Sequence, residues 1–171
     1  MIEVIFAAVG GLLAALIAGS FIEWFVHLLM HRRIILGKVH YRHHAQETSD
    51  GWFWEFVYYA GGAIPTAIGF AVGGWYLQLP WLGGGFAAGS LLYAVFAAYA
   101  HQVQHERPEL VFWMHPPIHA VHHDNRMYRA NFGIGVDVWD KLFGTYVKVD
   151  WTPDPARVRT SIRDFFRIRW L

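Results

Sequence analysis

The sequence predicts an all-α membrane protein, in which about three long transmembrane helices carry a histidine-rich helical cap on the cytoplasmic side. Hydrophobic residues make up 55% of the 171 positions and charged residues only 16%, whereas soluble domains have roughly 25% charged residues. Asp, Glu, Lys and Arg are absent from residues 4–22 and again from residues 56–105. The second gap is long enough for two crossings joined by a turn. This length suits one domain, so we predict a single unit over residues 1–171.

Three spans are expected, at about residues 4–26, 53–78 and 85–104. The first span begins with Met-Ile-Glu and no basic residue precedes Arg32, so it differs from a secretory signal peptide and is kept as structure. A turn between the second and third spans is predicted around Pro80 and the three glycines at 83–85, because these residues interrupt the apolar run. The neighbouring Trp and Tyr residues are typical of a membrane interface.

The basic residues predict which side of the membrane the cap occupies. All 14 Lys and Arg residues lie in the two segments that three crossings would put on one side, 27–52 and 105–171. The positive-inside tendency makes that side cytoplasmic and puts the N-terminus outside. Residues 160–171 are predicted to form a basic amphipathic helix, which either lies along the membrane surface or packs on the cap.

Composition also excludes some classes of partner and site. A formal net charge of +1 offers no large basic patch, so no nucleic-acid partner is expected. The chain has no cysteine, which excludes disulfides, thiolate zinc sites and iron–sulfur clusters.

The histidines are the candidate functional residues. None of the 11 lies between residues 45 and 100, so they form two sets, each on the cytoplasmic flank of a predicted span. Both sets contain a pair with a three-residue spacer followed by an H-x-x-H-H segment. A three-residue spacer on a helix puts both imidazoles on one face, one turn apart. The members of these motifs are His27, His31, His40, His43 and His44 in the first set, and His101, His105, His119, His122 and His123 in the second.

Ten imidazoles exceed the needs of one metal ion. First-row ions take four to six ligands, so ten histidines fit two ions of about five ligands each, and a dinuclear site is expected. Iron, copper, nickel and zinc all accept imidazole, so the ligands leave the metal open. His115 stands outside the motifs, and it is either an additional ligand or a residue that supports the site.

Five polar residues are candidates to orient a ligand imidazole, as carboxylates often do in metal sites. Glu23 lies one helical turn before His27, and Asp124 directly follows His123. Asn131 is a weaker candidate, together with Asp137 and Asp140.

The four histidine clusters, with a long apolar gap between the second and third, resemble the fatty acid hydroxylase and sterol desaturase superfamily of integral membrane di-iron enzymes. Glu-Trp-Phe-Val-His at 23–27, followed by His31, is similar to the family's opening motif. Asn-Phe-Gly at 131–133 and Trp-Asp-Lys-Leu-Phe-Gly-Thr-Tyr at 139–146 resemble its closing segment. The resemblance covers about residues 23–146. It implies that the ten histidines named above bind two iron ions, which zinc can replace in purified protein.

The resemblance also implies an activity: dioxygen-dependent hydroxylation or desaturation of a C–H bond in a lipid. The external electron donor would be a ferredoxin or a haem-type carrier. Both helical pairs have a three-residue spacer, where carotenoid hydroxylases of the superfamily usually have four. A fatty acyl or sphingolipid chain is therefore the favoured substrate, with a carotenoid or sterol as the alternative. The lipid, the carbon and the oligomeric state stay open.

Two other classes of protein are also histidine-rich. A membrane haem cytochrome needs one or two facing pairs of axial ligands, and adjacent histidines such as His43 and His44 are superfluous for that purpose. A metal transporter needs polar groups along its spans, where this chain offers little besides Ser20, Thr66 and Ser90.

Overall fold

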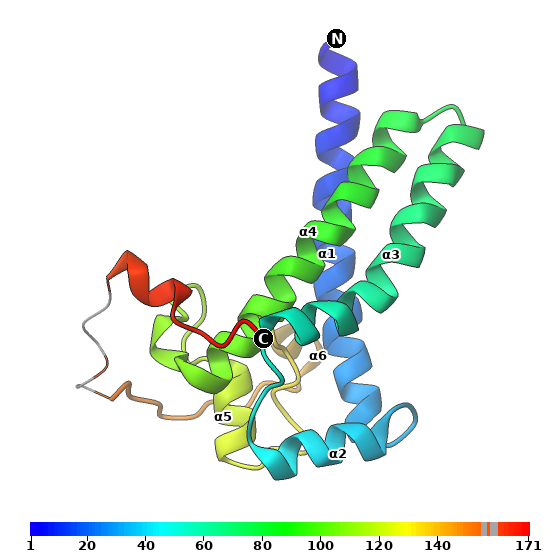
Figure 1. Ribbon diagram of the computed structural model, residues 1–171. Helices are drawn as coiled ribbons and strands as arrows, with labels where there is room; N and C mark the ends of the chain where they lie inside the picture. The colour runs from blue at the N-terminus through cyan, green and yellow to red at the C-terminus, as the bar shows by residue number, and fades with distance from the viewer. Residues whose placement is uncertain (155–156, 158–160) are drawn as a thin grey trace.

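The computed structural model describes residues 1–154, 157 and 161–171, and over these residues the protein is all-helical (Figure 1). Three helices are long and apolar enough to cross a membrane: α1 (Ile2–His31), α3 (Trp52–Tyr76) and α4 (Pro80–Glu106). The shorter elements are α2 (Gly37–Gln46), η1 (Pro108–Leu110), α5 (Ile118–Asp124), α6 (Val138–Phe143) and η2 (Ile162–Phe166). The prediction of an all-helical fold with three long apolar helices is confirmed.

The three long helices run side by side, and the short elements gather at one end of them (Figure 1). Helix α4 packs against both α1 and α3. This arrangement places the end of α1 and the end of α4 in the same layer as α2 and α5. All four of these helices carry histidines of the predicted motifs.

The turn between α3 and α4 lies earlier than the sequence predicts. Helix α4 begins at Pro80, because the fixed φ of proline suits the first turn of a helix. The glycines at 83–85 therefore lie inside the helix. Two of them are points of close helix packing. A Cβ atom on Gly83 would collide with the carbonyl oxygen of Phe70 in α3, and one on Gly85 would collide with that of Ala8 in α1. These glycines therefore mark helix contacts, which the sequence pattern did not distinguish from a turn.

The amphipathic helix predicted over residues 160–171 is wrong beyond Phe166, while Thr160 itself lies outside the described residues. After η2 the chain is irregular, and its backbone pairs with the start of α3. The amide of Trp52 donates to the carbonyl of Arg169 and the amide of Phe53 to that of Trp170, both at 2.9 Å. The first amides of a helix have no acceptor within it, so the C-terminal segment supplies acceptors for two amides of α3.

A small hydrophobic core lies beneath the histidine-rich end. It joins the end of α4, η1, α5 and the C-terminal segment, and its buried members are Val103, Leu110, Val111, Met114, Ile118, Val121 and Ile168. This core fixes α5 against α4, so the histidines of these two helices have a defined relative position.

Candidate metal centre

The structure brings all ten motif histidines together at one end of the helix bundle. Four helices supply them: His27 and His31 from α1, His40, His43 and His44 from α2, His101 and His105 from α4, and His119, His122 and His123 from α5. Within α1, α2 and α4 the paired residues are four positions apart, so their rings lie on one face of the helix. The imidazoles then divide into two groups around two separate points.

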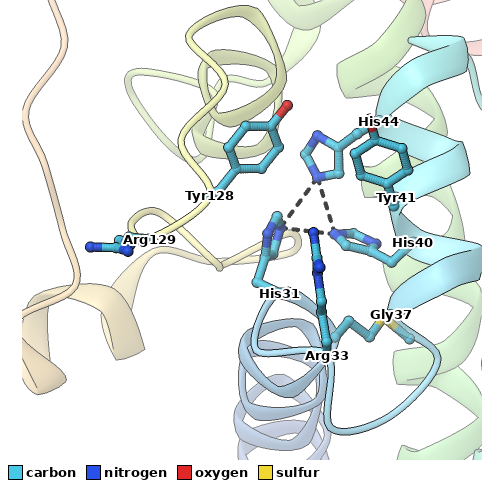
Figure 2. A pocket seen from close by; sticks show the side chains of 9 residues that line it. His31, Arg33, Gly37, His40, Tyr41, His44, Tyr128 and Arg129 are labelled. Carbon is cyan, nitrogen blue, oxygen red and sulfur yellow. Dashed lines mark hydrogen bonds between the residues drawn. The ribbon is translucent and has the colours of Figure 1, made fainter.

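The first histidine group consists of His27, His31, His40, His44 and His122. One nitrogen from each ring lies within 4.8 Å of the others. The closest Nε2 atoms are 2.8–3.3 Å apart, and Figure 2 shows three of these rings pointing at one another. Two nitrogens bound at right angles to one ion, each at about 2.0–2.1 Å, would be about 2.9 Å apart. The spacing therefore suits ligands of a single ion.

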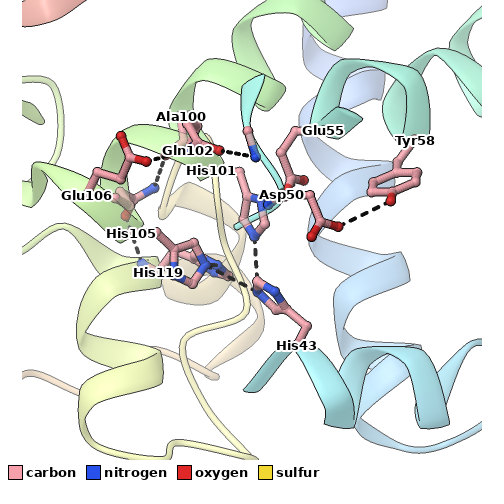
Figure 3. A network of polar contacts seen from close by, with 12 residues as sticks. His43, Asp50, Glu55, Tyr58, Ala100, His101, Gln102, His105, Glu106 and His119 are labelled. Carbon is pink, nitrogen blue, oxygen red and sulfur yellow. Dashed lines mark hydrogen bonds and ion pairs between the residues drawn. The ribbon is translucent and has the colours of Figure 1, made fainter. Parts of the chain in front are cut away.

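The second histidine group consists of His43, His101, His105 and His119, again with one nitrogen each within 4.8 Å of the others. The Nε2 atom of His43 is 3.2 Å from those of His101 and His105, and the His105 and His119 Nε2 atoms are also 3.2 Å apart (Figure 3). Four convergent nitrogens are enough for a second ion.

His123 lies between the two groups. Its ring stacks on that of His44 with centroids 4.0 Å apart, and its centroid is 4.5 Å from that of His105 in the second group. The side chain is buried, and neither ring nitrogen has a hydrogen-bond partner within the described part of the chain. Buried polar atoms are rarely left unpaired, so a bound cation is a natural partner for this imidazole.

Two carbonyl groups fix the tautomers of ligand candidates in the first group. The Nδ1 atom of His27 is 2.6 Å from the carbonyl oxygen of Phe132, and that of His122 is 2.9 Å from the carbonyl oxygen of Ala130. A carbonyl oxygen only accepts, so both Nδ1 atoms carry the proton and both Nε2 atoms present a lone pair to the group. Lone pairs that face one another gain nothing without a cation between them.

Glu55 performs the same role in the second group, and the sequence analysis missed it. Its carboxylate lies 2.7 Å from Nδ1 of His101, and the two side chains are only 7% and 9% exposed (Figure 3). A carboxylate that accepts from a metal-binding imidazole fixes its orientation and raises its basicity. One signal could have found it: Glu55 is the last charged residue before the charge-free run at 56–105.

The imidazoles of α2 and α5 are held neutral. Burial lowers the pKa of His40 to about 2 and that of His43 to about 3, and neighbouring imidazoles lower both further. The pKa of His44 falls to about 4, chiefly through burial, and so does that of His122. Metal ions bind the neutral form of imidazole, so these side chains are ready to act as ligands at neutral pH.

Glu23 lies in α1 beside the site and contacts a loop rather than an imidazole. Its carboxylate accepts from the amides of Ile134 and Gly135, at 3.0 and 2.8 Å, and from the hydroxyl of Tyr93 at 2.9 Å. The group is buried, and these three donors satisfy it. Its contacts anchor residues 134–135 to α1.

Asp140 holds the preceding part of the same loop. This fully buried carboxylate accepts from the amides of Phe132 and Gly133, at 2.9 and 2.6 Å, and from the hydroxyl of Thr145 at 2.6 Å. The carbonyl of Phe132 in turn accepts from His27. Asp140 therefore acts on the first histidine group through the backbone.

The remaining candidates lie outside both groups. Asn131 is buried and exchanges two hydrogen bonds with the backbone of Val147. Asp124 is exposed, and burial of part of its carboxyl raises its pKa. His115 is exposed as well, with its ring 5.6 Å from that of Trp151.

A cavity of about 700 Å³ lies between α1, α3 and α4 and reaches both histidine groups. Its walls are mostly apolar, and His27, His43 and His119 line its inner end. Ala15 lines it as well. Ala15 lies twelve residues before His27 on the same helix, which corresponds to about 18 Å along the helix axis. This membrane cavity therefore runs along α1 from the middle of the span to the imidazoles.

Three apolar helices and two groups of convergent imidazoles define the class of the protein, a membrane protein with a histidine-built metal-binding site. The family model described as fatty acid hydroxylase matches residues 12–145, well over half of the chain. The protein belongs to the fatty acid hydroxylase family, within the sterol desaturase superfamily, and is an oxidoreductase. The predicted family is thus confirmed. Neither the curated proteins nor the solved structures include a match.

Proposed function

We propose that this protein binds two iron ions and uses dioxygen to hydroxylate a C–H bond in the acyl chain of a membrane lipid. In one turnover the C–H bond, dioxygen, two electrons and two protons give a C–OH group and one water. The single observation that carries the proposal is the convergence of two imidazole groups at the inner end of an apolar cavity. Bound iron would supply the reduction of dioxygen that this reaction requires.

The proposed ligands follow the two histidine groups. The first ion is held by His27, His31, His40, His44 and His122, and the second by His43, His101, His105 and His119 with His123 as the fifth ligand. His123 is assigned to the second ion because the second histidine group otherwise supplies only four nitrogens. The ring centroid of His123 also lies 4.7 Å or less from the ring centroids of His43, His105 and His119.

The protein side chains position the ligands and the substrate. Glu55 and the carbonyls of Phe132 and Ala130 orient three imidazoles, and burial keeps water away from them. The membrane cavity lies along about 18 Å of α1. One leaflet of a bilayer has a hydrocarbon depth of about 15 Å, half of the roughly 30 Å core. A single linear chain therefore suits the cavity, which supports a fatty acyl or sphingolipid substrate.

The proposed reaction is tested with purified protein in lipid nanodiscs, which is loaded with iron, reduced by a stoichiometric amount of dithionite without air, and then exposed to isotopically heavy dioxygen. Fatty acyl, sphingolipid, sterol and carotenoid lipids are offered separately. We expect one heavy oxygen atom in an acyl lipid, none after His43→Ala, and a normal yield after His115→Ala, which changes a histidine outside both groups. A new double bond without oxygen would instead make the enzyme a desaturase. No lipid product at two irons per chain would refute the proposal.

We also propose that the histidine-rich end faces the cytoplasm. Each Lys and Arg flanks the spans on that side, which supports this orientation. The native chain has no cysteine, so single substitutions give clean labels. In intact cells an impermeant maleimide should label Leu79→Cys, in the turn between α3 and α4, and should leave Lys148→Cys unlabelled until the cells are opened. The reverse pattern would invert the orientation.

A further inference from the structure

A second cavity opens on the first histidine group from outside the spans. It measures about 300 Å³, and its walls include His31, His40 and His44 (Figure 2). The rest of the lining comes from the end of α1, from α2 and from the loop after α5. His40 lines the membrane cavity too, so the first group lies between an apolar cavity and this second one.

The second cavity is positively charged, and we call it the basic pocket. Arg33 and Arg129 line it, both are exposed, and the lining contains no Asp or Glu. Four further exposed basic residues lie on the same segments of the chain: Arg32, Lys38, Arg42 and Arg126. Within the described part of the chain, none of these six side chains makes an ion pair. Such a concentration of unpaired positive charge attracts an acidic partner.

An aromatic side chain connects the mouth of the basic pocket to the imidazoles. Tyr128 is 47% exposed, and its ring centroid lies 5.5 Å from that of His44 and 6.0 Å from that of His31 (Figure 2). A carrier that docks over the two arginines would therefore lie one aromatic ring away from two ligand candidates.

We propose that the basic pocket is the docking surface for an acidic, one-electron carrier protein, which reduces the metal centre past Tyr128. The inference rests on the proposed function, because hydroxylation consumes two electrons that the lipid does not supply. Two reduced carriers dock in turn, and each is oxidised by one electron. The lipid occupies the membrane cavity on the other side of His40, so substrate and carrier do not compete for space.

The experiment compares two reductants with the iron-loaded protein in nanodiscs of neutral phosphatidylcholine. One is an acidic [2Fe–2S] ferredoxin kept reduced by its reductase and NADPH, and the other is dithionite, a small molecule that needs no docking surface. Because dithionite reduces dioxygen directly, it is added without air in the amount that reduces the centre once, and the dithionite-driven rate is measured after dioxygen is admitted. The variant is Arg33→Glu combined with Arg129→Glu. The matched control is Arg163→Glu, an exposed charge reversal in η2, which does not line the pocket.

We expect the ferredoxin-driven rate of the native protein to fall steeply with ionic strength. In the double variant the ratio of ferredoxin-driven to dithionite-driven rate should fall at least about tenfold, through a higher KM for ferredoxin, because like charges oppose docking. Arg163→Glu should change this ratio less than about twofold.

Three results would overturn the inference while leaving the proposed function intact. In the first, the native protein turns over with dithionite but not with ferredoxin. In the second, the double variant has the same KM for ferredoxin as the native protein. In the third, the double variant loses the same fraction of its rate with both reductants. In the last case, a higher turnover rate of the native protein in nanodiscs of anionic phosphatidylglycerol than in phosphatidylcholine would show that the pocket binds a lipid headgroup. An absence of turnover with either reductant at full iron loading would count against the proposed function itself.

Discussion

Replacement of Glu55 should weaken the binding of one metal ion and spare the other. Its carboxylate accepts a 2.7 Å hydrogen bond from His101, and both side chains are almost completely buried, so solvent screens the pair little. A hydrogen bond to a charged group contributes about 1.5–3 kcal/mol. At about 1.4 kcal/mol per factor of ten, Glu55→Leu should lower the affinity of the second histidine group for metal about 10- to 100-fold.

The assay measures metal per chain by elemental analysis after equilibration with increasing concentrations of a chelator. The native protein should lose its two ions over a similar range, whereas Glu55→Leu should lose one ion at a chelator activity about 10- to 100-fold lower. Glu55→Gln keeps a hydrogen-bond acceptor without the charge, so it should lose this ion at a chelator activity between those of the native protein and Glu55→Leu. Glu3→Gln, a carboxylate at the far end of α1, is the control. If Glu55→Leu released both ions together, or neither ion earlier than the native protein does, this account of Glu55 would be refuted.

Three further predictions concern stability. Gly85→Ala should destabilise the protein by about 1–3 kcal/mol, because the new Cβ atom meets the backbone of α1. Gly84→Ala is the control, because a Cβ atom there has open space and should cost less than about 1 kcal/mol. Thermal unfolding in detergent compares the two variants. Asp140→Asn should lower the free energy of unfolding by about 1–3 kcal/mol, since its loop amides lose an acceptor, and the exposed Asp150→Asn should change little. In metal-free protein, the free energy of unfolding should decrease as the pH falls from about 6.5 to about 4. Burial lowers the pKa of His122 from 6.5 to about 4 in the folded state, so over this window His122 binds a proton in the unfolded state and not in the folded state. A flat profile between pH 4 and 6.5 would contradict that assignment.

The sequence was sufficient to predict which histidines gather at the site, because helix periodicity puts residues four apart on one face. It did not predict how they divide between the two histidine groups. His43 and His44 are adjacent, but successive residues of a helix point about 100° apart, and the structure puts them in different groups. The sequence also left open that His122 joins the first group while His123 lies between the two groups, because these positions depend on how α2 and α5 pack against α1 and α4.

Partners supplied by the backbone were also beyond the sequence. The carbonyls of Phe132 and Ala130 orient two imidazoles, yet any residue could present a carbonyl at those positions. Glu23 is a related case: its position one turn before His27 suggests contact with that ring, whereas the fold brings a distant loop closer. Such contacts between remote segments follow from tertiary packing alone.

The pairing of the C-terminal segment with α3 has a consequence for biosynthesis. Arg169 and Trp170, which accept the first amides of α3, leave the ribosome after every histidine of the site has been made. Until they emerge, the helical turn that carries Glu55 lacks two of its backbone partners. The surroundings of the second histidine group are therefore completed only after the chain has been made as far as Trp170.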